Sequence, residues 1–121
     1  MQATDFWGEI GTSAARTPSS IMREQAAALG PKIQHLVEAK VETRSYGQSI
    51  VHSFDIVVPA LDGYTYRLFE IEHDPHLYPL SVRGEDLEIA TEMQFTAWLR
   101  KQLSSEQTRR VVSNLLAQVQ S

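Results

Sequence analysis

Residues 49–73 read SIVHSFDIVVPALDGYTYRLFEIEH, and this stretch decides the fold. Two runs rich in β-branched and aromatic residues, 50–58 and 64–71, flank the five residues PALDG at 59–63. Proline cannot donate a hydrogen bond to a strand ladder, and Asp-Gly readily adopts the positive φ angles of a tight loop. The pattern therefore predicts a β-hairpin with residues 59–63 as its loop.

The predicted loop also fixes a register, because successive side chains of a strand point to opposite faces of the sheet. With residues 59–63 as the loop, Asp55 pairs with Arg67 on one face and His52 pairs with Glu70 on the other. Opposite charges facing each other across two strands contribute roughly 0.2–1 kcal/mol per pair. The sequence therefore predicts two separate ion pairs instead of one site made of four residues.

The chain has 121 residues and no cysteine, and its 42% hydrophobic and 21% charged residues are ordinary for a soluble protein. We expect one domain, residues 1–121, with a core large enough to need no disulfide. The absence of cysteine excludes thiolate metal sites and thiolate nucleophiles. The sequence contains neither a secretory signal nor a run of about 20 apolar residues, so we expect a cytoplasmic protein with no membrane partner.

Charge is unevenly distributed along the chain. Residues 50–92 carry nine acidic and two basic side chains, whereas residues 93–121 carry four basic and one acidic. The acidic middle would repel a phosphate backbone, so we expect no nucleic-acid partner. We expect the basic C-terminal segment to neutralise the sheet within the chain, and contact with an acidic partner is the alternative.

The N-terminal third predicts two helices. Phe6, Trp7 and Ile10 recur at helical spacing, which predicts a short first helix that two glycines weaken. Threonine followed by proline at residues 17–18 is typical of a helix start, and Gly-Pro at residues 30–31 is typical of a helix end.

The remaining segments complete an α+β pattern. Residues 37–44 alternate apolar and charged, which predicts a strand with one wet face, and residues 77–82 and 87–90 predict a second, smaller hairpin. Thr91 and the serines at 104–105 are caps for two C-terminal helices. The predicted fold is an antiparallel β-meander of four to five strands flanked by two N-terminal and two C-terminal helices.

Two short strings suggest metal chemistry. The Glu38-Ala39-Lys40 string resembles the Glu-x-Lys pair of metal-dependent nucleases, although alternating charges on an exposed strand explain it without chemistry. The His73-Asp74-Pro75-His76 string offers ligands for zinc, which would need further ligands such as His52 or Glu72. We interpret both strings as solvated surface residues and expect no metal or cofactor.

The polar residues that deserve testing as a site lie in the central hairpin and the loop after it. They are His52, Asp55, Arg67, Glu70, His73, Asp74 and His76. No nucleophile, glycine-rich phosphate loop or zinc-binding helix accompanies them, which counts against an enzyme.

The last predicted helix carries an apolar stripe wider than one intramolecular contact needs. Its interface candidates are Val112, Leu115, Leu116 and Val119. We therefore expect a small protein-interaction or adaptor-type domain, with a protein partner or a second copy of the chain as its ligand. The alternatives are a small enzyme, a metal-binding domain, or a ligand pocket lined by Trp7, Tyr66, Phe69 and Trp98.

Overall fold

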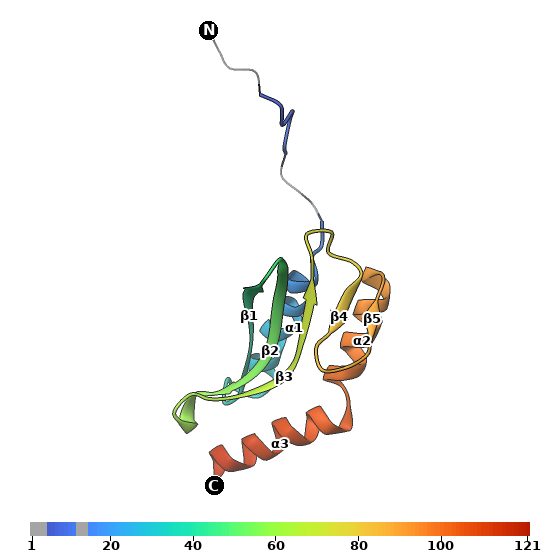
Figure 1. The fold of residues 1–121 in the computed structure, drawn as a ribbon. Coiled ribbons are helices and arrows are strands. Elements are labelled where there is room, and N and C mark those ends of the chain that lie inside the picture. The colour runs from blue at the N-terminus through green and yellow to red at the C-terminus, as the bar shows by residue number, and fades with distance from the viewer. Residues whose placement is uncertain (1–4, 12–14) are drawn as a thin grey trace.

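The computed structural model describes residues 5–11 and 15–121. Figure 1 shows the elements in chain order: α1 (Pro18–Lys32), β1 (Glu38–Tyr46), β2 (Ser49–Val58), the 3-10 turn η1 (Pro59–Leu61), β3 (Tyr64–His73), β4 (Leu80–Val82), β5 (Glu88–Ile89), α2 (Glu92–Leu103) and α3 (Glu106–Gln120). The predicted α+β class is confirmed. The number of N-terminal helices was wrong, because one helix precedes the sheet instead of two.

The missing first helix has a simple physical explanation. Residues 5–11 contain no helix, Gly8 has a φ of 66°, and all seven residues are exposed. A helix of one or two turns is unstable in water unless an apolar face packs on something. The rest of the predicted helix falls on residues 12–14, which lie outside the described part of the chain.

The sheet is an antiparallel meander in which all five strands follow in chain order, β1-β2-β3-β4-β5. The central hairpin has the predicted loop, since β2 ends at Val58 and β3 begins at Tyr64. Asp62 and Gly63 take φ angles of 58° and 71°, the positive values that the Asp-Gly pair predicted.

The predicted register holds only on the loop side of the hairpin. Asp55 faces Arg67 as expected, but a β-bulge follows, and Phe54 faces Phe69 instead of Leu68. Leu68 is therefore the extra residue of the bulge. Two consecutive side chains of β3 lie opposite one side chain of β2, and the pairing beyond them shifts by one residue.

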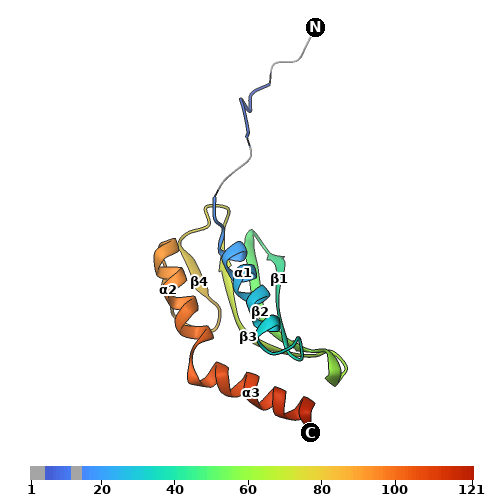
Figure 2. The same ribbon diagram turned by 180° about the vertical axis from the view of Figure 1, so that it is seen from behind.

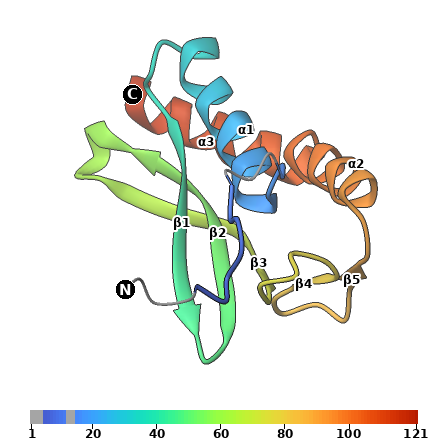
Figure 3. The same cartoon turned by 90° about the horizontal axis from the view of Figure 1, so that it is seen from above.

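All three helices lie on one face of the sheet, which we call the helix face, and the other side is the open face (Figures 2 and 3). Helix α1 packs mainly on β1. The core combines α1, the strands and α2, with the largest buried side chains including Ile21, Met22, Ile56, Phe95 and Leu99. No helix in the described part of the chain is long and apolar enough to cross a lipid bilayer.

Each helix begins at a capping side chain that the sequence pointed to. The side-chain oxygens of Thr17, Thr91 and Ser105 accept hydrogen bonds from backbone N–H groups three residues later, at 3.1, 3.2 and 3.2 Å. Helix α3 differs from the other two helices in one respect: none of its side chains is buried. Its apolar side chains are half-buried against the edge of the core.

Candidate functional site

The bulge divides the polar candidates between the two faces of the sheet. Beyond Leu68, every residue of β3 lies one pairing position away from its predicted place. The predicted pair of His52 with Glu70 was therefore wrong, since His52 faces Ile71 and Glu70 faces Ser53.

On the helix face, two buried histidines face each other. The Nε2 atoms of His52 and His73 lie 2.8 Å apart. His73 donates from Nδ1 to the carbonyl oxygen of Asp74 at 2.8 Å, so its Nε2 accepts the proton of His52. The free Nδ1 of His52 then accepts from the Thr43 hydroxyl at 2.8 Å, and that oxygen accepts from Arg23 at 3.2 Å.

This chain of hydrogen bonds includes a hydroxyl beside an imidazole, which is the arrangement of a nucleophile and its base. However, burial of the ring, together with His73 and Arg23, lowers the pKa of His52 to about 4. A base with so low a pKa draws a proton from a threonine hydroxyl poorly. The geometry therefore favours a structural role for the pair.

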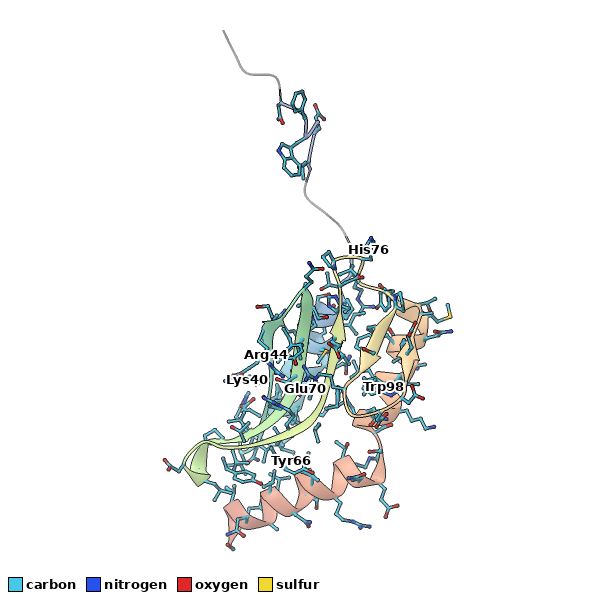
Figure 4. The ribbon with its side chains drawn as sticks, viewed as in Figure 1. Lys40, Arg44, Tyr66, Glu70, His76 and Trp98 are labelled. Atoms are coloured by element: carbon cyan, nitrogen blue, oxygen red, sulfur yellow. The ribbon has the colours of Figure 1, made fainter. Side chains whose placement is uncertain are left out.

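On the open face, Asp55 and Arg67 form the ion pair that the sequence predicted. The Asp55 side chain is 3% exposed, and it accepts hydrogen bonds from Arg67 Nε at 3.2 Å and from the Ser53 hydroxyl at 3.3 Å. Arg67 also contacts Glu70 at 3.3 Å, and Arg44 binds the same carboxylate and lowers its pKa. Figure 4 shows Arg44 and Glu70 on this face. The network joins β1, β2 and β3.

The histidines of the loop after β3 do not converge on one point. His73 is buried against His52, whereas the His76 side chain is 85% exposed and its ring contacts Asp74 at 3.1 Å. Figure 4 shows His76 at the end of the sheet opposite α3. Within residues 5–11 and 15–121, no three His, Asp or Glu side chains are placed to hold a metal ion.

The charged residues of the nuclease-like string also form ion pairs with residues near them in the sequence. Glu38 contacts His35 at 2.7 Å, and Lys40 contacts Glu42 at 2.6 Å. Asp55, the third group that a nuclease site would need, is engaged by Arg67. The three side chains form separate ion pairs.

The four aromatic residues expected to line one pocket are likewise separated. Trp7 lies in the N-terminal segment and is 80% exposed. Tyr66 and Phe69 line a small cavity of about 200 Å³ beside α3, and Trp98 packs edge-on against Phe69 with ring centroids 4.9 Å apart. The prediction that these four residues line one pocket was therefore wrong.

One cavity of the helix face is a groove that sequence reasoning missed. It has a volume of about 410 Å³ and lies between α1, α3 and the sheet. Phe54, Ile56 and Leu68 form its floor, Leu29 lies on the α1 side, and Val112 on the α3 side. We call it the α1/α3 groove.

Cations border this apolar groove. Lys32 and Arg109 line it, and both also line an adjoining cavity of about 400 Å³ together with Arg16 and Arg100. Arg16 pairs with Glu24 at 2.6 Å, but the other three make no ion pair with any described residue. No aspartate or glutamate of the described residues lines either cavity. The groove therefore combines an apolar floor with uncompensated positive charge.

The interface candidates on α3 are divided by this groove. Val112 and Leu116 line it, whereas Leu115 and Val119 do not. All four are half-buried and pack against the core. The wide stripe and the basic C-terminal segment were signals of this site, but only the position of α3 shows that they meet at a cavity.

Comparisons of the chain with models of protein families, with curated proteins and with solved structures gave no match.

Proposed function

We propose that this protein is an interaction module that holds an apolar segment of a partner protein, carrying acidic residues, in the α1/α3 groove. The observation that carries the proposal is the groove itself, which is apolar and lined by Lys32 and Arg109, with Arg100 lining the adjoining cavity, and these three cations have no described acidic partner. Apolar contact would supply affinity, and the cations would select for carboxylates and set the orientation of the segment.

The shape of the site supports a protein segment as ligand. Two helices, α1 and α3, border the groove over a sheet, an arrangement in which an amphipathic helix can lay its apolar face. Helix α3 contributes no buried side chain, so less burial holds it in place than holds α1 or α2. A small displacement of α3 would admit bulky side chains at moderate cost.

The positions and pairing of the polar residues support a binding function over a catalytic one. Asp55 and Glu70 are paired with Arg67 and Arg44 on the open face, and none of these four residues lines the groove. His52 and His73 form a buried hydrogen-bonded pair on the helix face, and neither lines the groove. Among the described residues, no aspartate, glutamate or histidine lines the groove.

The test uses two labelled synthetic helices that share leucine and alanine positions and differ only in having glutamate or lysine on the polar face. Fluorescence anisotropy should show that the glutamate peptide binds the protein and the lysine peptide does not. Ala28→Trp and Ser113→Trp place a large ring in the groove and should each weaken binding by tenfold or more, because a filled groove has no room for the peptide.

Matched controls come from the same two helices. Ala27 and Asn114 are exposed neighbours of Ala28 and Ser113 and do not line the groove. Ala27→Trp and Asn114→Trp should bind the glutamate peptide as the unmodified protein does. Equal binding of both peptides, or unchanged binding by the groove-filling variants, would refute the proposal.

A further inference from the structure

Residues 5–11, the N-terminal arm, expose large apolar side chains. Phe6 is 94% exposed, Trp7 80% and Ile10 73%. Asp5 and Glu9 add two carboxylates to the same short segment. Figure 1 shows the arm in blue beyond the end of the sheet. Aromatic side chains gathered on an exposed segment are typical of a contact surface, because burying each gains about 1.5–3 kcal/mol.

The arm has the chemistry that the α1/α3 groove requires. Phe6 and Ile10 lie four residues apart with Trp7 beside them, so they share one face if the arm becomes helical. Asp5 and Glu9 also lie four residues apart and would form an acidic edge. The arm therefore pairs an apolar face with negative charge, whereas the groove pairs an apolar floor with positive charge.

We propose that the arm of one copy docks in the α1/α3 groove of a second copy, and that the exchange is reciprocal and forms a symmetric homodimer. This inference rests on the groove identified above as the binding site, and it names one partner for it. The helical spacing at residues 6–10 then belongs to the docked arm, which orders when its apolar face finds a surface.

The single chain shows why the partner is a second copy. An extended residue spans at most about 3.6 Å, so residues 11–17 could carry the arm back along α1 towards its own groove. Nevertheless Phe6 and Trp7 are almost fully exposed in the single chain, and its groove is open. The apolar face of the arm and the groove therefore both stay exposed until a second copy binds.

The area is sufficient for a stable dimer. Buried aromatic side chains cover about 150–250 Å² each. A reciprocal exchange brings two such rings from each copy, together with the groove surface they cover, so the total reaches on the order of 1,200 Å², where specific interfaces begin. Closed two-fold exchange also leaves no arm or groove unoccupied.

The experiment is a charge-reversal complementation in full-length protein, followed by light scattering on a sizing column. Asp5→Lys with Glu9→Lys reverses the arm, and Lys32→Glu with Arg109→Glu reverses the groove. The unmodified protein should be a dimer and each double variant alone a monomer, because arm and groove then repel. Their mixture should form a heterodimer, since each arm meets a groove of opposite charge.

Each outcome decides the question. A mixture that stays monomeric, or double variants that dimerise as the unmodified protein does, would overturn arm exchange. Trp98→Phe leaves Trp7 as the only tryptophan. A blue-shifted emission from Trp7 in a monomer would show the arm docked in its own groove, which would also overturn arm exchange. Phe6→Ser with Trp7→Ser should be monomeric, and Met93→Ser, an exposed apolar change on α2, should not alter the mass.

Failure of arm exchange can be told apart from failure of the groove as a binding site. The unmodified protein could be monomeric and still bind the glutamate peptide, with binding lost in the Ser113→Trp variant. That result would support the proposed function and refute the dimer. A dimer that persists in Phe6→Ser with Trp7→Ser would assign dimerisation to another surface and refute arm exchange directly.

Discussion

The Nε2 atoms of His52 and His73 face each other at 2.8 Å beneath the helices, and one proton occupies the space between them. His52 is 4% exposed and His73 is 6% exposed. A second proton on the pair would set two N–H groups against each other in a site with little water. The neutral state of the His52 ring is therefore part of the folded structure.

This pair predicts that the protein loses stability in mild acid. Burial lowers the pKa of His52 from 6.5 to about 4, so the unfolded chain binds more protons than the folded chain between these values. The contribution is complete above pH 6.5, declines as the pH falls, and is gone below about pH 4. At about 1.4 kcal/mol per pKa unit it amounts to roughly 3 kcal/mol. Urea unfolding across this range, in the unmodified protein and in His52→Gln, measures it; His76→Gln should keep the full pH dependence.

The open face predicts a contrast between two arginines. Arg67→Ala leaves the buried Asp55 carboxylate with only the Ser53 hydroxyl, and should cost about 1–3 kcal/mol of unfolding free energy. Arg44→Ala leaves Glu70 paired with Arg67 and should cost less than about 1 kcal/mol. Chemical denaturation compares the two. In the Arg67→Ala background, Asp55→Asn should restore part of the lost unfolding free energy. Equal losses in Arg67→Ala and Arg44→Ala would contradict the pairing of Asp55 with Arg67.

Helix α3 should open more easily than α2. It buries no side chain, whereas α2 buries Phe95 and Leu99. Local opening free energy follows the apolar area that must be exposed, so α3 amides should exchange hydrogen faster than α2 amides. Leu99→Ala should cost about 2–5 kcal/mol, and Leu116→Ala clearly less. Uniform amide protection across both helices would contradict the picture of a loosely held α3.

Gly30 predicts a coupling between α1 and β1. An alanine Cβ at this position would collide with Glu38 Oε2, which must move away. Replacing a helical glycine by alanine normally stabilises by roughly 0.5–1 kcal/mol, so Gly30→Ala alone should be near neutral. In the Glu38→Ala background it should show the full gain. A double-mutant cycle of unfolding free energies measures the difference, and additive effects would show that the contact is unimportant.

The sequence predicted what depends on local chemistry. The loop at residues 59–63, the three capping residues and the pairing of Asp55 with Arg67 all follow from residue type and short spacing. The bulge does not, because Phe54 can face either Leu68 or Phe69, and both pairs are apolar. One undetected extra residue was enough to misplace His52 relative to Glu70.

The groove escaped prediction for a different reason. Its floor, walls and cations come from α1, β1, β2, β3, α2 and α3, and apolar residues of these elements read as ordinary core in the sequence. Whether the stripe of α3 closes tightly or stands away from the sheet depends on packing between elements far apart in the chain. No local pattern encodes that distance.

At the bulge, Leu68 contributes a side chain to the surface of the sheet but does not pair with a residue of β2. Arg67 keeps its partner on one side of the bulge and Phe69 keeps its partner on the other, so deleting Leu68 would leave every pair of the hairpin in register. The deletion would remove one side chain from the floor beneath α3 and relax the local bend. Leu68 is thus dispensable to the ladder and specific to the cavity, so deleting this one residue would change the lining of the α1/α3 groove and leave the strand pairing intact.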